Sequence, residues 1–118
     1  MVLLAEDEGL ISLALEDALD EAGFRIAGPF AHCAHALEWL QHNTPDAALL
    51  DIELADGPCT EVARILHRRG VLIVFFSAGA VHDLEIRRLV PDALWFMKPA
   101  DYREVIRALN EPGPRAAP

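Results

Sequence analysis

The sequence predicts an α/β fold in which a parallel five-stranded sheet lies between two layers of helices. Short apolar runs alternate with segments of helical periodicity along the chain, and four of these runs end in a polar residue. Continuous apolar runs of this length are typical of strands that are buried on both faces, as in parallel sheets. Because crossovers between parallel strands are right-handed and cover both faces, such β–α units form a doubly wound, three-layer sandwich.

Five strands are expected along the chain. Four are apolar runs, at residues 2–5, 47–50, 71–76 and 94–97, and residues 24–27 form a fifth strand in which apolar and polar side chains alternate. Alternation is typical of a partly exposed strand, so the second strand belongs at an edge. The most apolar strands belong in the middle, which favours the order 2-1-3-4-5. A loop is expected at residues 56–58, where Asp, Gly and Pro follow one another.

Helices are expected at residues 8–22, 32–42, 59–69, 82–89 and 101–109. Helical spacing in the first of them predicts that Ile11, Leu15 and Ala22 face the core. In the last helix, Asp101 is the expected N-cap, with Glu104 at the capping-box position.

The length of 118 residues and the formal charge of −9 limit the classes of function. The length predicts one domain at residues 1–110, followed by a Pro- and Ala-rich tail at 111–118 that is expected to be disordered. The acidic balance argues against direct binding to nucleic acid. No signal peptide and no run of roughly 20 apolar residues is found. Two widely separated cysteines are typical of a reducing compartment, so we expect a cytoplasmic protein that does not bind membranes.

The polar residues that follow the strands are the candidate site. Ligands of open α/β sheets bind beyond the carboxyl ends of the strands, where this chain has Glu6, Asp7, Asp51, Ser77 and Lys98. Lys98 is the only lysine of the chain. Three carboxylates in one pocket repel each other, so a pKa rises or a cation binds. Oxygen ligands on polar loops favour Mg²⁺, which binds through one or two carboxylates, water and phosphate.

These residue types also fit phosphoryl transfer. A carboxylate can attack phosphorus and form an aspartyl-phosphate, and the transfer requires positive charge around the phosphoryl oxygens. Asp51 is the best nucleophile because it is a single acid at the end of a central strand, whereas the adjacent acids Glu6 and Asp7 are better placed to hold the metal directly or through water. Mg²⁺ and Lys98 would each bind a phosphoryl oxygen, and the Ser77 hydroxyl or a nearby backbone N–H would bind the third.

The chain resembles the CheY-like receiver domain of bacterial two-component response regulators over residues 2–110. The segments that carry the resemblance are LAEDE at 4–8, PDAALLD at 45–51, DG at 56–57, FSA at 76–78 and MKP at 97–99. Each segment alone is a weak signal, but their order and separations together are specific, with 44 residues from Asp7 to Asp51, 26 from there to Ser77 and 21 on to Lys98. The resemblance implies a flavodoxin-like fold and a signalling switch, which is not an enzyme although it catalyses its own phosphorylation and dephosphorylation.

The resemblance also implies a role for each site residue. Asp51 would be the phosphoacceptor, in a phosphorelay fed by a sensor histidine kinase or a histidine phosphotransfer protein. The metal ligands would be Glu6, Asp7, Asp51 and the main-chain carbonyl of Glu53. Ser77 and Trp95 would form the switch, Lys98 would pair with the phosphoryl oxygens, and the bond to Pro99 would be cis.

The output surface implied by the resemblance is built by the fourth helix, the fifth strand and the fifth helix. It would bind a downstream protein or a second copy of the chain. Four arginines are expected to make this surface basic: Arg87, Arg88, Arg103 and Arg107.

Three departures from the family pattern leave alternatives open. Glu6 stands where Asp is commoner, Ala55 where many relatives have Pro, and Trp95 where Tyr or Phe is usual. A phosphorylation-independent pseudo-receiver that acts only as an interaction module is the main alternative. A small phosphohydrolase of the haloacid dehalogenase type is the other, but it would require a nucleophile on the first strand and an Asp at position 53.

Overall fold

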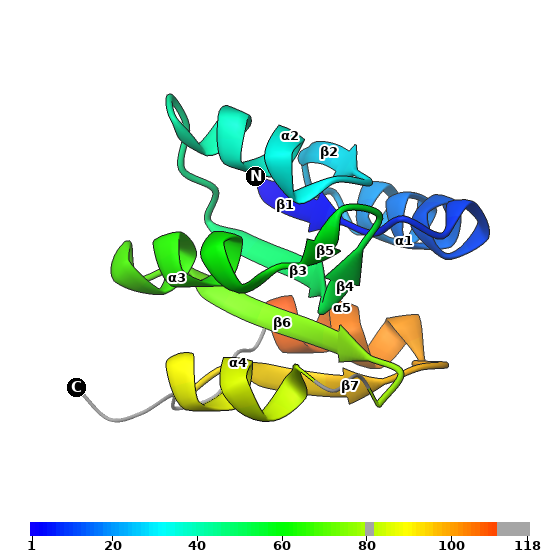
Figure 1. Ribbon diagram of the computed structural model, residues 1–118. Helices are drawn as coiled ribbons and strands as arrows, with labels where there is room; N and C mark the ends of the chain where they lie inside the picture. The colour runs from blue at the N-terminus through cyan, green and yellow to red at the C-terminus, as the bar shows by residue number, and fades with distance from the viewer. Residues whose placement is uncertain (80–81, 111–118) are drawn as a thin grey trace.

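The computed structural model describes residues 1–79 and 82–110, and the tail expected at 111–118 lies outside this part of the chain. Five parallel strands form the main sheet in the order β2-β1-β3-β6-β7 (Figure 1), which confirms the predicted order. The strands are β1 (Val2–Ala5), β2 (Ile26–Phe30), β3 (Ala47–Asp51), β6 (Leu72–Ser77) and β7 (Leu94–Met97).

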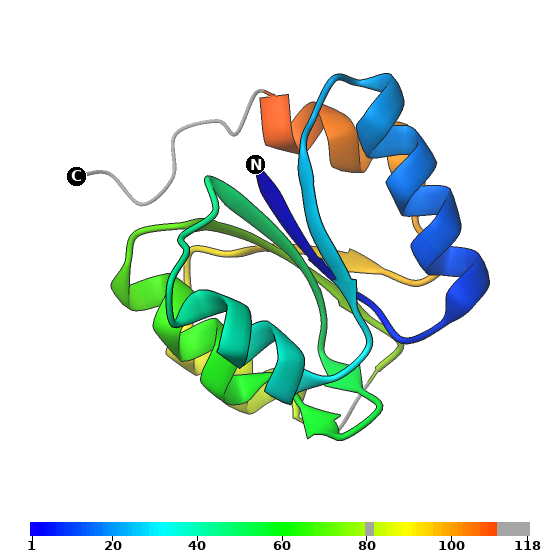
Figure 2. The same cartoon turned by 90° about the horizontal axis from the view of Figure 1, so that it is seen from above.

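Five helices cover the two faces of the sheet, as expected for a doubly wound fold. One face carries α1 (Gly9–Glu21) and α5 (Tyr102–Asn110). The other carries α2 (Cys33–Leu40), α3 (Thr60–Arg68) and α4 (Asp83–Leu89), as the view along the sheet shows (Figure 2). Among the described residues, no helix has the length and the hydropathy that are needed to cross a bilayer.

The two faces of the sheet bury separate apolar cores. Leu3 and Leu50 point into the core beneath α2, α3 and α4, whereas their neighbours Leu4 and Leu49 point into the core beneath α1 and α5. All four side chains are fully buried. This alternation follows from the two-residue period of a strand, and it explains why the central strands are apolar at every position.

The first helix buries a different set of residues from the one predicted. Leu15 is buried and Ile11 packs against the core, as expected, but Ala22 is exposed because it caps the helix. Ser12 and Leu19 are buried in addition. Two other apolar side chains of this helix, Leu10 and Leu13, are exposed to solvent.

The predicted position of the second strand was wrong. Phe24 belongs to the turn that ends α1, where its N–H bonds to the carbonyl of Leu19, so β2 starts at Ile26 and continues to Phe30. The sequence concealed this continuation because Gly28 and Pro29 are turn signals. Gly28 has a φ of 108°, and a Cβ at this position would lie 2.6 Å from the carbonyl oxygen of Leu4. Only glycine therefore allows this close approach of β2 to β1.

The loop expected at residues 56–58 is part of a small antiparallel hairpin, formed by β4 (Glu53–Leu54) and β5 (Gly57–Pro58). Its turn contains Asp56, whose carboxylate accepts hydrogen bonds from the N–H groups of Cys33 (2.6 Å) and Ala34 (3.1 Å) at the start of α2. These bonds lower the pKa of Asp56 to about 2. The hairpin that follows the Asp51 strand is thus attached to a neighbouring helix, which holds it in place.

The predicted cap of the last helix is present in part. Asp101 Oδ1 accepts a hydrogen bond from the N–H of Arg103 at 2.9 Å, as an N-cap does. The reciprocal bond of a capping box, from the Asp101 N–H to the Glu104 carboxylate, is not found among the described hydrogen bonds, where Asp101 pairs instead with the Arg103 guanidinium at 3.3 Å.

Candidate functional site

The carboxyl ends of four strands bring the predicted site residues to one edge of the sheet. Glu6 and Asp7 follow β1, Asp51 ends β3, Ser77 ends β6, and Lys98 follows β7 (Figure 1). Ala5 pairs with Leu50, Asp51 with Phe76 and Ser77 with Met97, so neighbouring strands end within one residue of one another.

Lys98 is the centre of this group. Its Nζ donates a hydrogen bond to Asp51 Oδ2 at 2.7 Å and a longer one to Glu6 Oε2 at 3.3 Å. Burial lowers the pKa of Lys98, but the bonds to Asp51 and Glu6 outweigh burial, and the net shift is upward. The lysine is therefore held as a cation beside the proposed nucleophile. The peptide bond from Lys98 to Pro99 is cis, as the resemblance implies, and an unexpected second cis bond joins Gly28 to Pro29.

Glu6 shows that the site carries more negative charge than Lys98 balances. Its side chain is 2% exposed. Burial raises the pKa of Glu6 to about 7; bonds from the Glu8 N–H and Lys98 oppose the shift, and the nearby Asp51 adds to it. Oε1 lies 3.0 Å from Lys98 Nζ but accepts no hydrogen bond from the described residues. A buried carboxylate oxygen without a hydrogen bond is a ligand atom available to a cation.

The donor set fits a hard divalent cation. Glu6, Asp7 and Asp51 each offer one carboxylate oxygen, and these three oxygens lie within 4.8 Å of one another. Asp7 is exposed, so water can complete the coordination shell, as Mg²⁺ requires. The N–H of Glu53 donates to Asp51 Oδ1 at 3.3 Å, which orients the carboxylate from the side of the hairpin. The role of the Glu53 carbonyl as a ligand remains a prediction.

Ser77 has a partner that the sequence did not reveal. Its side chain is fully buried, and its hydroxyl donates to Asp83 Oδ2 at the start of α4. The hydroxyl also accepts a hydrogen bond from the N–H of Gly79 at 2.9 Å. In the sequence, an acid at this position is indistinguishable from an ordinary residue of a first helical turn.

Trp95 lies on β7 between the core and α4. Its ring packs against Phe75 with centroids 4.8 Å apart, and the Arg87 guanidinium lies over the ring, 3.9 Å from its centroid. This cation–π contact joins α4 to β7. Arg103 instead lines a groove with residues of α1, on the opposite face of the sheet. Because α4 and α5 flank the edge strand β7, the basic surface expected to include Arg87 and Arg103 stays a prediction.

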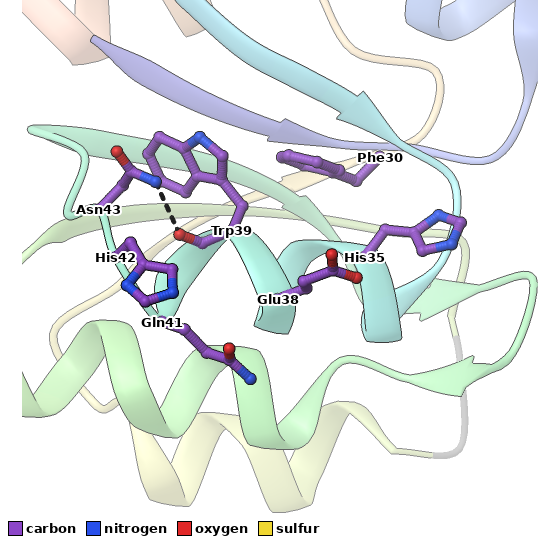
Figure 3. Close-up of a pocket in the computed structure, with 7 residues that line it drawn as sticks. All are labelled: Phe30, His35, Glu38, Trp39, Gln41, His42 and Asn43. Atoms are coloured by element: carbon purple, nitrogen blue, oxygen red, sulfur yellow. Dashed lines mark hydrogen bonds between the residues drawn. The ribbon is translucent and has the colours of Figure 1, made fainter.

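A second groove lies along α2 and the end of β2 (Figure 3). It is lined by Phe30, His35, Glu38, Trp39, Gln41, His42 and Asn43. Phe30 and Trp39 form its apolar side with ring centroids 6.3 Å apart, and Asn43 donates to the Trp39 carbonyl at 2.9 Å. The described metal-type cluster does not include its histidines.

The comparison with known families decides the class of the protein. The model of the response regulator receiver domain matches residues 2–110. This chain belongs to that family. Because receiver domains are signalling switches of two-component systems, and because Asp51 ends β3 rather than β1, the phosphohydrolase alternative is set aside.

Individual relatives agree with this assignment. The chain is 30% identical over 111 residues to the transcriptional regulatory protein PdtaR of Mycobacterium tuberculosis, covering 92% of this chain and 54% of PdtaR. A response regulator receiver protein from Sinorhizobium medicae has a TM-score of 0.81 at 30% identity, with 93% of this chain and 90% of that chain covered. SdrG from Sphingomonas melonis has a TM-score of 0.77 at 32% identity, with coverage of 93% and 92%. The chain spans about half the length of the curated relatives it matches.

Proposed function

We propose that this receiver domain is phosphorylated on Asp51 in a Mg²⁺-dependent reaction, by a sensor histidine kinase or a histidine phosphotransfer protein. The observation that carries the proposal is the Asp51 carboxylate, which lies 2.7 Å from Lys98 Nζ beside two further acids whose charge Lys98 does not balance. A cation fits this surplus of negative charge, and a phosphoryl group requires both cations.

The chain's own residues orient the nucleophile. The Glu53 N–H and Lys98 Nζ each hold one oxygen of Asp51. As the bond between phosphorus and the donor imidazole breaks, a carboxylate oxygen of Asp51 forms a bond to phosphorus, and Lys98 neutralises a phosphoryl oxygen. A magnesium ion, held by Glu6, Asp7, Asp51 and the Glu53 carbonyl, would supply the remaining positive charge.

The exposed apolar side chains of α1 support a kinase or phosphotransfer partner. Leu10 is 86% exposed and Leu13 is 55% exposed, on the helix that begins directly after Asp7. Met97, which is 58% exposed, precedes Lys98 on the other side of the pocket. A donor that brings its phosphohistidine to Asp51 would cover these side chains, and their burial would stabilise the complex.

The remaining parts of the proposal concern output and location. Ser77 and Trp95 would transmit the phosphorylated state to the face formed by α4, β7 and α5, where a downstream protein or a second copy binds. We place this function in the cytoplasm, with no direct contact to nucleic acid or membrane.

The test is phosphorylation by acetyl phosphate, a small phosphodonor, followed by intact mass measurement. With Mg²⁺, the wild-type chain should gain one phosphoryl group, and EDTA should prevent the gain. Asp51→Asn should remain unmodified, whereas Asp17→Asn, which removes an exposed carboxylate of α1, should react like the wild type. A folded wild-type chain that gains no mass would favour the pseudo-receiver.

A further inference from the structure

The Ser77 hydroxyl is already engaged in the absence of a phosphoryl group. A serine hydroxyl has one proton to donate, and here it is donated to Asp83 Oδ2. Ser77 is fully buried, so water does not compete for this proton. A phosphoryl oxygen on Asp51 can receive this hydrogen bond only if the bond to Asp83 breaks.

Losing that bond is unfavourable for Asp83. Its other oxygen, Oδ1, is buried and accepts no hydrogen bond from any described residue. Loss of the Ser77 bond would leave both carboxylate oxygens without a donor, close to a newly added anion. Burying a polar group without a partner is unfavourable, and more so for a charged group.

Asp83 also connects the pocket to the helix that is proposed to signal. It is the first residue of α4, and Ile86, one turn later, is fully buried in the core beneath that helix. The preceding residue, His82, lies with Nε2 3.5 Å from Glu53 Oε1 on the hairpin. The first turn of α4 is therefore held at the edge of the pocket by side-chain contacts.

We propose that Asp83 is a positioning residue that competes with the phosphoryl group on Asp51 for the Ser77 hydroxyl. The proposal rests on the proposed function and adds its regulation. In the free protein, Asp83 holds the Ser77 proton and the start of α4 stays on the pocket. In the phosphorylated protein, Ser77 donates to the phosphoryl oxygen, and the unpartnered carboxylate moves toward solvent with the first turn of α4. The competition lowers the affinity of the pocket for a phosphoryl group and couples binding to α4.

The test measures the affinity for beryllofluoride, a mimic of the phosphoryl group, in the presence of Mg²⁺. Asp83→Ala removes the competitor, so binding should tighten roughly three- to tenfold, the effect of one net hydrogen bond. Asp83→Asn keeps an acceptor oxygen for Ser77 but not the charge, so binding should tighten less than in Asp83→Ala. This isosteric variant also provides a folded comparison if the alanine variant is unstable.

Two controls separate competition for the Ser77 proton from the general effect of removing a negative charge. Glu85→Ala removes an exposed carboxylate from the same helix turn and should leave the affinity unchanged. In a Ser77→Ala background, Asp83→Ala should no longer tighten binding, because the shared proton is absent. Equal tightening by Glu85→Ala, or tightening that persists without the Ser77 hydroxyl, would overturn the proposal.

The outcomes also distinguish this proposal from the proposed function. A wild-type chain that neither binds beryllofluoride nor gains mass from acetyl phosphate would contradict the proposed function. A wild-type chain that does both, with Asp83→Ala indistinguishable from it, would contradict only the role of Asp83.

Discussion

Lys98 is the residue on which the charge balance of the pocket depends. It lies within 4 Å of three acids, with Nζ 2.7 Å from Asp51, 3.0 Å from Glu6 and 3.9 Å from Glu8, and its side chain is only 13% exposed. A single lysine cannot neutralise this set. Burial raises the pKa of Glu6 to about 7 despite the pairing with Lys98, and the nearby Asp51 adds to the rise. The pocket of the free protein is thus stabilised by one cation and is suited to a second.

Removal of Lys98 should therefore destabilise the fold in a way that Mg²⁺ corrects. Lys98→Met should lower the free energy of unfolding by about 2 kcal/mol in Mg²⁺-free buffer, below the 3–5 kcal/mol of a fully buried pair because Glu6 can take up a proton. Millimolar Mg²⁺ should restore more stability to this variant than to the wild type. Urea unfolding with and without Mg²⁺ measures both, with Arg88→Met as the exposed control; equal Mg²⁺ responses would contradict this role of Lys98.

The Asp56 carboxylate should make the stability of the fold depend on pH. Hydrogen bonds from the Cys33 and Ala34 N–H groups lower its pKa from 3.8 to about 2. Because the folded-state pKa is the lower one, the carboxylate contributes stability above about pH 4 and loses it as the pH falls toward 2. Asp56→Ala should be less stable at pH 7, and its stability should fall less between pH 4 and pH 2. If Asp56→Ala keeps the pH dependence of the wild type, these hydrogen bonds do not contribute as described.

At the scale of elements, the edge strand β2 depends on one glycine. Gly28→Ala should lower the free energy of unfolding by roughly 1–3 kcal/mol, because the added Cβ meets the Leu4 carbonyl and φ is positive. Gly9→Ala is the matched control, since Gly9 lies in α1 with no atom near its Cβ position. That substitution should be neutral or stabilising by up to about 1 kcal/mol. Similar unfolding midpoints for the two variants would contradict the close approach.

The sequence predicts a strand or helix correctly where the pattern of apolar residues within the element itself is enough to identify it. The runs at β1, β3, β6 and β7 are apolar because both faces of the sheet are covered, and their order follows from which strand alternates. The position of β2 was missed because Gly28 reads as a turn residue in the sequence. Its place in the strand depends on its close approach to the Leu4 carbonyl, which the sequence does not show. The hairpin at Glu53 was missed because its attachment to α2 comes from residues more than 20 positions away.

The site, too, was predictable from the sequence only where strand ends determine it. Strand ends located Glu6, Asp7, Asp51 and Lys98 at one edge, because parallel strands end together. The Ser77–Asp83 bond was not predictable, because it depends on where the first turn of α4 lies relative to β6.

At the scale of the whole molecule, the acidic pocket should couple metal binding to folding. A ligand that binds only the folded state stabilises it by mass action, by about 1.4 kcal/mol at ten times its Kd. Mg²⁺ should therefore raise the Tm by a few degrees. Asp7→Ala should remove most of this increase, whereas Asp20→Ala, on the exposed side of α1, should keep it. A thermal scan in which Mg²⁺ has no effect on the wild type would contradict the metal site.

The most direct measurement locates the phosphoryl group itself. After reaction with acetyl phosphate and Mg²⁺, borohydride reduction converts an aspartyl-phosphate to homoserine, which tandem mass spectrometry of peptides can assign to one position. We predict homoserine at position 51, and unmodified Asp at positions 7, 46 and 56. Modification at another carboxylate, or no homoserine in a chain shown to be folded, would contradict the assignment of Asp51 as the phosphoacceptor.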